Sequence, residues 1–88
     1  MSEERDLRHR TIEILADILE TQPSRVRPQD RLREDLGLDS LQSLEMLSVL
    51  SEEFHVDLPM EEAMELRTVD DACAFVARAR PSAPRARP

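Results

Sequence analysis

The sequence lacks several features that would mark other classes of protein. It has one cysteine, Cys73, which cannot form an internal disulfide, so nothing in it calls for an oxidising compartment. It lacks an apolar run long enough to cross a bilayer and a cationic-then-apolar signal peptide at its N-terminus. It also lacks alternating β-branched runs and hairpin signals. These absences predict one small all-α domain that is soluble and cytoplasmic.

Negative charge is concentrated in the middle of the chain. The 88 residues carry a formal net charge of −7. Residues 34–71 hold twelve acids against one arginine, whereas residues 1–33 hold seven of each and residues 72–88 hold four arginines and no acid. An acidic middle repels nucleic acid and anionic lipid and attracts basic protein partners. A merely solvated surface would give the same pattern, so both interpretations stay open.

The first predicted helix covers about residues 4–20, because apolar side chains recur there on one arc at ~100° per residue. Gln22 ends it, since a residue before proline is pushed out of the helical region. A long connection follows, which we expect to be held to the core by scattered apolar side chains: Val26, Leu32, Leu36 and Leu38. Gly37, the only glycine, is expected to adopt a backbone conformation that a side chain would resist.

The second predicted helix, about residues 40–54, has apolar side chains on two opposite sides. One side is the expected core face and carries Met46, Leu47, Leu50 and Phe54. Leu41 and Leu44 project to the other side, and polar residues surround them: Glu45, Ser48 and Glu52. Leu41 and Leu44 either pack against another helix of the domain or form an apolar spot ringed by carboxylates. Such a spot would suit a basic, partly apolar partner surface.

Two shorter elements are predicted after the second helix. Residues 55–59 form a short extended connection with Val56 and Leu58 pointing inward. Residues 60–66 form a short third helix.

The last helix is predicted from Thr68, its N-cap, to about Arg80, with Asp71 completing a capping box. Its inward side carries Val69, Ala72, Cys73 and Val76. Cys73 is therefore expected to be a small buried hydrophobe rather than a redox or catalytic thiol. The arginine- and proline-rich residues 81–88 are predicted to be disordered, which leaves residues 1–80 as the domain.

Ser40 is the candidate functional residue. It lies at the start of the second predicted helix, where unpaired backbone N–H groups and the helix dipole favour a phosphate. A serine hydrolase is not indicated, because His9 and His55 are the only histidines and no Gly-x-Ser-x-Gly turn is present. Two distant histidines and one cysteine also supply no ligand set for a metal. We therefore expect neither catalysis nor a metal site.

The order of motifs resembles that of the acyl carrier proteins over about residues 4–80. The resemblance is carried by Leu36-Gly37 before Asp39-Ser40-Leu41, by the acidic helix ending Glu52-Glu53-Phe54, by the extended link to Pro59, and by Thr68-Val69 opening the last helix. It implies a small four-helix bundle with three main helices, a short third helix and a long first loop. It also implies a carrier that is a substrate and partner of enzymes, acts as a monomer and binds neither nucleic acid nor membrane.

The resemblance further implies which residues act. Ser40 would receive 4′-phosphopantetheine from coenzyme A through a phosphopantetheinyl transferase, and the thiol of that arm would carry acyl groups as thioesters. Asp39 would support the transfer by helping to hold magnesium, and Leu41 would complete the attachment site. Acyl-loading, condensing or other acyl-transfer enzymes with basic surfaces would dock at Leu41, Leu44, Glu45, Ser48, Glu52 and Glu61.

The chain departs from the family at several positions. Gln42 stands where many members have an acid, His55 replaces a frequent glycine, and Ser48 replaces an often larger apolar residue. Met60 and Met64 replace residues that are often acidic. With Met46 they are candidates for lining an acyl cleft, with ordinary packing as the alternative. These departures favour a specialised polyketide or related pathway. Primary fatty acid synthesis stays open, and so does a degenerate helical adaptor without a prosthetic group.

Overall fold

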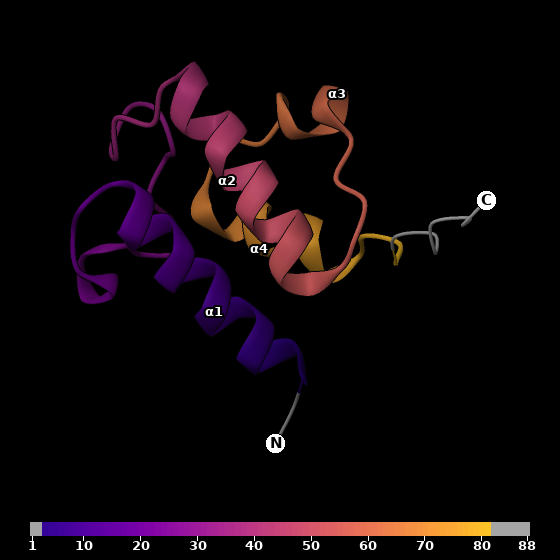
Figure 1. Ribbon diagram of the computed structural model, residues 1–88. Helices are drawn as coiled ribbons and strands as arrows, with labels where there is room; N and C mark the ends of the chain where they lie inside the picture. The colour runs from indigo at the N-terminus through magenta and orange to yellow at the C-terminus, as the bar shows by residue number, and fades with distance from the viewer. Residues whose placement is uncertain (1–2, 82–88) are drawn as a thin grey trace.

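The regular structure of this protein is helical. The computed structural model describes residues 3–81, in which no strand forms and the regular elements are α1 (Glu3–Ile18), the 3₁₀ helix η1 (Pro23–Arg25), α2 (Ser40–Phe54), α3 (Met60–Ala63) and α4 (Val69–Ala77). Helices α1 and α2 run side by side in opposite directions, α4 lies behind α2, and the short α3 lies on the side of α2 away from α1 (Figure 1). The predicted all-α bundle with a long first loop is therefore confirmed.

The observed boundaries agree with the prediction for α2 and differ elsewhere. Helix α1 ends at Ile18, two residues early, because Glu20 adopts the left-handed conformation with φ 57°. The Glu20 N–H donates to the Asp17 carbonyl at 3.2 Å and the Thr21 N–H to the Ala16 carbonyl at 2.8 Å, the two bonds of a Schellman end. Glycine usually occupies the left-handed position of this motif, so a glutamate there is no signal for a helix end. The 3₁₀ helix η1 was also not predicted.

The later helices are shorter than the periodicity predicted. Helix α3 closes after one turn at Ala63, although hydrogen-bonded turns continue to Leu66. Helix α4 ends at Ala77 rather than Arg80. Its start is as predicted, with the Thr68 hydroxyl accepting from the Asp71 N–H at 3.1 Å in a complete capping box.

The core lies among α1, α2 and α4, and the long connection closes it. Leu15, Leu50 and Val69 are fully buried where the three helices meet. The expected inward residues of α4 are all buried, and Phe75 joins them, which the sequence analysis did not predict. From the connection, three of the four predicted anchors are buried, while Leu36 is half-buried: Val26, Leu32 and Leu38. The connection is thus part of the packed domain and fixes where α2 begins.

Gly37 permits the turn that leads into α2. Its φ is +73°, in the left-handed region that glycine enters without steric cost. The Leu38 N–H then donates to the Leu32 carbonyl at 2.8 Å, and the Leu32 N–H donates to the Arg67 carbonyl at 2.8 Å. These bonds hold the connection against the turn that precedes α4.

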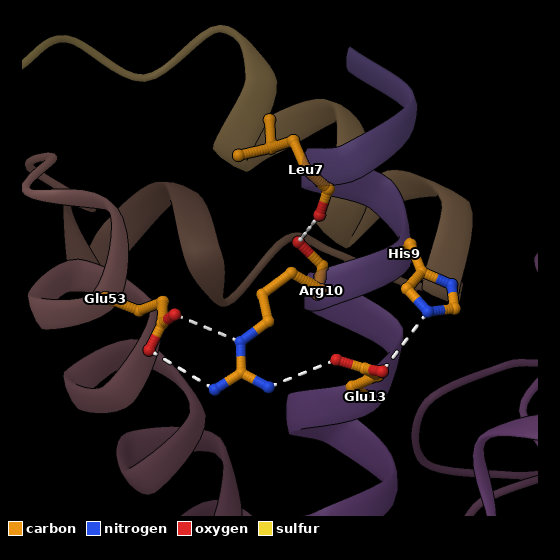
Figure 2. Close-up of polar contacts among 6 residues, drawn as sticks. Leu7, His9, Arg10, Glu13 and Glu53 are labelled. Carbon is orange, nitrogen blue, oxygen red and sulfur yellow. Dashed lines mark hydrogen bonds and ion pairs between the residues drawn. The ribbon is translucent and has the colours of Figure 1, made fainter. Parts of the chain in front are cut away.

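A charged cluster ties α1 to the C-terminal half of α2. The Arg10 guanidinium donates to Glu53 Oε2 at 3.0 Å and to Glu13 Oε1 at 3.1 Å, and His9 Nε2 lies 3.1 Å from the other oxygen of Glu13 (Figure 2). The hydrogen bond from Arg10 is the main reason that the pKa of Glu53 lies below the ordinary value of 4.5. The cluster therefore favours the charged carboxylate of Glu53 in the folded protein.

The described chain ends against the link between α2 and α3. Val56 and Pro81 form an isolated antiparallel bridge, and the Asp57 N–H donates to the Arg80 carbonyl at 2.9 Å. The segment expected to be disordered, 81–88, thus begins at a paired residue, and residues 82–88 lie outside the described residues. Across residues 3–81, no helix combines the length and apolarity that crossing a membrane requires.

Candidate functional site

Ser40 is the first residue of α2, directly after a complete N-terminal cap. The Asp39 carboxylate accepts from the Gln42 N–H at 2.8 Å, and the Gln42 side-chain oxygen accepts from the Asp39 N–H at 3.2 Å. Gln42, a departure from the resembling family, therefore has a structural role as the partner of Asp39 in a capping box. The Asp-x-x-Gln spacing was the signal in the sequence, and the sequence analysis did not use it.

The Ser40 hydroxyl is available for reaction with an external group. Its side chain is exposed and makes no hydrogen bond with any of the described residues. The backbone N–H groups of Ser40 and Leu41 have no acceptor within the helix, as is usual in a first turn. The positive end of the helix dipole adds to their attraction for an anion. The site therefore fits a phosphate ester on Ser40.

Neither histidine is placed to activate Ser40. His55 follows the last residue of α2, so it lies roughly 20 Å along the helix axis from Ser40 at 1.5 Å per residue. It takes the left-handed conformation, φ 55°, which explains why glycine suits this position. His9 pairs with Glu13 on α1. Neither histidine is therefore positioned to take a proton from the Ser40 hydroxyl.

The outward side of α2 is an apolar spot ringed by acids. Leu41 is 68% exposed and Leu44 is 46% exposed, so neither packs against another helix of the described chain. This finding decides between the two interpretations left open by the helical periodicity. The three polar residues predicted to surround these leucines are also exposed: Glu45, Ser48 and Glu52. So is Glu61, a further predicted docking residue, in the first turn of α3. We refer to these six residues as the acidic face.

A small apolar pocket opens between α2 and α3, beside the start of α2. The three methionines named from the sequence all line it: Met46 is buried at 2% exposure, whereas Met60 and Met64 are 45% and 69% exposed. The cavity volume is about 40 Å³. The remaining lining residues, which the sequence analysis did not assign to a pocket, are Leu32, Arg33, Leu38, Ser43, Leu47, Ala63 and Leu66. Most come from segments that are separate in sequence, so no local pattern groups them.

Cys73 lies in the core, away from these features. It is buried, and that burial is the main reason that the pKa of its thiol is raised. A raised pKa leaves the thiol protonated and unreactive. Within residues 3–81, no group of three or more histidine, cysteine or acidic side chains is arranged to hold a metal ion.

Comparison with known proteins gives consistent results. The family model described as "Phosphopantetheine attachment site" matches residues 9–76. An acyl carrier protein of Thermosynechococcus vestitus is 46% identical over 63 residues, which is 72% of this chain and 78% of that protein. The mitochondrial acyl carrier protein 2 of Arabidopsis thaliana is 37% identical over 68 residues, which is 77% of this chain and 54% of that protein.

A solved structure shows the same fold. The solution structure of the apo doublet acyl carrier protein from prodigiosin biosynthesis matches 98% of this chain and 42% of its own, with a TM-score of 0.77 and 21% identity. At that identity the match supports the architecture of the bundle alone.

Proposed function

This chain belongs to the acyl carrier protein family, whose members carry a covalently attached 4′-phosphopantetheine, and from that premise we propose that Ser40 is the attachment residue. One observation carries the proposal: Ser40, on the first turn of a capped helix, has an exposed hydroxyl with no hydrogen-bond partner among residues 3–81. Ser43, one turn further along α2, donates its hydroxyl to the Asp39 carbonyl at 2.9 Å. Of these two neighbouring serines, only Ser40 therefore has a free hydroxyl.

The attachment is a phosphoryl transfer in which another enzyme supplies the base. A bond forms between Ser40 Oγ and the phosphorus on the pantetheine side of coenzyme A, while the bond from that phosphorus to adenosine 3′,5′-bisphosphate breaks. The Ser40 proton passes to a base of the transferase, because neither histidine of this chain lies beside Ser40. The attached arm supplies a thiol that holds acyl groups as thioesters.

Asp39 has two roles in this proposal. Its carboxylate caps α2 and so holds Ser40 at the helix start. Asp39 also directly precedes Ser40 in the chain. Its second carboxylate oxygen would therefore suit a magnesium ion that arrives with coenzyme A. Leu41 follows directly and is exposed, so it is placed to contact the transferase beside the attachment point.

The acidic face is the proposed docking surface for enzymes that load, extend or remove the acyl group. Its leucines supply apolar contact, and its carboxylates complement a basic partner surface. The pocket beside it is the proposed acyl cleft, with Met46 as its buried floor and Met60 and Met64 at its edge. Methionine suits such a cleft, because its unbranched side chain adapts to different shapes.

We further propose that the cargo belongs to a specialised polyketide or related pathway rather than primary fatty acid synthesis. Support comes from Ser48, a small polar residue on the acidic face, and from Arg33 and Ser43, which add polar groups to the pocket lining. The test replaces the native carrier with this protein in a purified bacterial fatty acid synthesis system. We expect saturated acyl chains to be extended slowly on this carrier. Extension at the rate seen with the native carrier would contradict this part of the proposal.

The attachment residue is tested by mass spectrometry. The protein is incubated with coenzyme A, magnesium and a promiscuous phosphopantetheinyl transferase. We expect a mass gain of one phosphopantetheine in the native protein and in Ser43→Ala, and none in Ser40→Ala. A gain that persists in Ser40→Ala would move the site elsewhere. No gain in the native protein would favour the adaptor without a prosthetic group.

A further inference from the structure

Three arginines from two segments that are far apart in sequence gather at one surface hollow. Arg31 and Arg33 come from the long connection and Arg67 from the turn before α4, and the hollow is completed by Glu34, Met64 and Leu66. Backbone pairing brings the two segments together: Arg31 forms an antiparallel bridge with Thr68, and the Leu32 N–H donates to the Arg67 carbonyl. The fold therefore holds these arginine-bearing segments in a defined arrangement.

Two of these arginines have no anionic partner in the described part of the chain. The Arg31 guanidinium lies 3.3 Å from Asp35 and is thus already paired. The side chains of Arg33 and Arg67 form no hydrogen bond or ion pair with any residue from 3 to 81. Glu34 is the acid in the lining, so the hollow keeps an excess of positive charge. This is unexpected, because Arg67 is the one arginine in a stretch that carries twelve acids.

The hollow adjoins the apolar pocket, with which it shares three lining residues. Arg33, Met64 and Leu66 line both. The pocket in turn reaches Leu38 and Ser43, which lie two residues before Ser40 and one helical turn after it. A chain tethered at Ser40 that enters the pocket would therefore have guanidinium groups at the far edge of its path. The pocket is small, so the apolar part of such a chain is short unless α3 moves.

We propose that the acyl cargo has a short apolar segment, which lies in the pocket, and a carboxylate at its far end, which pairs with Arg33 and Arg67. This inference rests on the proposed attachment at Ser40. Arginine suits the role because its planar guanidinium binds a carboxylate through two parallel hydrogen bonds. An exposed ion pair is weak alone, but the tether makes the contact intramolecular and raises its effective concentration.

The test compares three loaded forms of the full chain. The transferase moves the phosphopantetheine arm from coenzyme A, hexanoyl-coenzyme A or adipoyl-coenzyme A onto Ser40 and releases adenosine 3′,5′-bisphosphate. The products carry the arm alone, a methyl-ended cargo and a carboxylate-ended cargo. Loading is checked by mass, and thioester cleavage by hydroxylamine is then timed for the two acylated forms. Arginine Nε–H resonances are recorded for all three.

We expect the adipoyl thioester to be cleaved about two- to fivefold more slowly than the hexanoyl thioester, the range that an exposed ion pair supplies. This protection should disappear in Arg33→Gln with Arg67→Gln and weaken in 0.5 M salt. The matched control is Arg25→Gln with Arg27→Gln, which replaces two exposed arginines outside the hollow. This control variant should keep the slower cleavage of the adipoyl thioester. The Arg33 and Arg67 resonances should move in the adipoyl form alone.

Several results would overturn the inference. Equal cleavage of the two thioesters after normal loading would overturn it and leave the attachment at Ser40 intact. Movement of the Arg33 and Arg67 resonances by the same amount in the arm-only form would show that these arginines hold the phosphate of the arm. Absence of loading would overturn the attachment at Ser40 and this inference together.

Discussion

The two faces of α2 use the same residue type for different purposes. Leu50, on the inner face, is 1% exposed, whereas Leu44, on the acidic face, is 46% exposed. The inner leucine fills a space among three helices, so its removal leaves a cavity. The outer leucine contacts solvent and belongs to the proposed docking surface. One helix thus supports the core and carries the proposed docking surface, and the two roles should be separable by substitution.

The largest expected effect is on the inner face. Leu50→Ala should lower the free energy of unfolding by about 2–5 kcal/mol, because a buried leucine is replaced by a cavity. Leu44→Ala, the matched change on the outer face, should alter it by no more than about 0.5 kcal/mol. Urea unfolding followed by far-UV circular dichroism measures both. Similar losses in the two variants would mean that the faces are not distinct.

Next in size is the effect of charge on the acidic face. Glu45→Arg with Glu52→Arg should lower kcat/KM for a partner acyltransferase about tenfold at low salt, since complementary charge speeds association. Helicity should not change. Asp17→Arg with Glu20→Arg makes the same change in net charge at exposed positions near the end of α1. If both pairs slowed transfer equally, net charge rather than the acidic face would govern docking.

A smaller effect is expected at the cap on which both faces depend. Asp39→Ala should cost about 1 kcal/mol of unfolding free energy, because the Gln42 N–H loses its acceptor. Asp39→Asn should keep most of this stability, since asparagine is also a good N-cap. Denaturant unfolding measures the cap, and the rate of phosphopantetheine loading measures the carboxylate. Normal loading of Asp39→Asn would show that Asp39 acts through the cap alone.

The smallest effect is expected where α2 meets α1. Arg10 lowers the pKa of Glu53, so the ion pair stabilises the fold above the unfolded-state pKa and is lost as pH falls through the folded-state value. Glu53→Gln should therefore be less stable than the native protein at pH 7, and the difference should vanish in strong acid. Thermal unfolding from pH 7 to pH 3 measures this. Glu52→Gln, which removes the adjacent carboxylate and leaves the pair of Arg10 and Glu53 intact, should match the native protein at pH 7.

Local signals in the sequence were sufficient for some elements and insufficient for others. Gly37 and the capping box of Thr68 and Asp71 act over a few residues, so their roles were predictable. The end of α1 was misplaced because Glu20 takes a conformation that glycine usually takes. The ends of α3 and α4 were overestimated, since periodicity does not show where a helix stops.

The sequence by itself determined the helical class, the start of α2 at Ser40 and the family, because periodicity, caps and motif order are properties of neighbouring residues. Only the tertiary structure decided that Leu41 and Leu44 face solvent, that three methionines line one pocket and that three arginines gather beside it. Those facts depend on the pairing of residues 31–32 with residues 67–68 and on the packing of α2 against α1. Contacts between distant segments leave no local pattern in a single sequence.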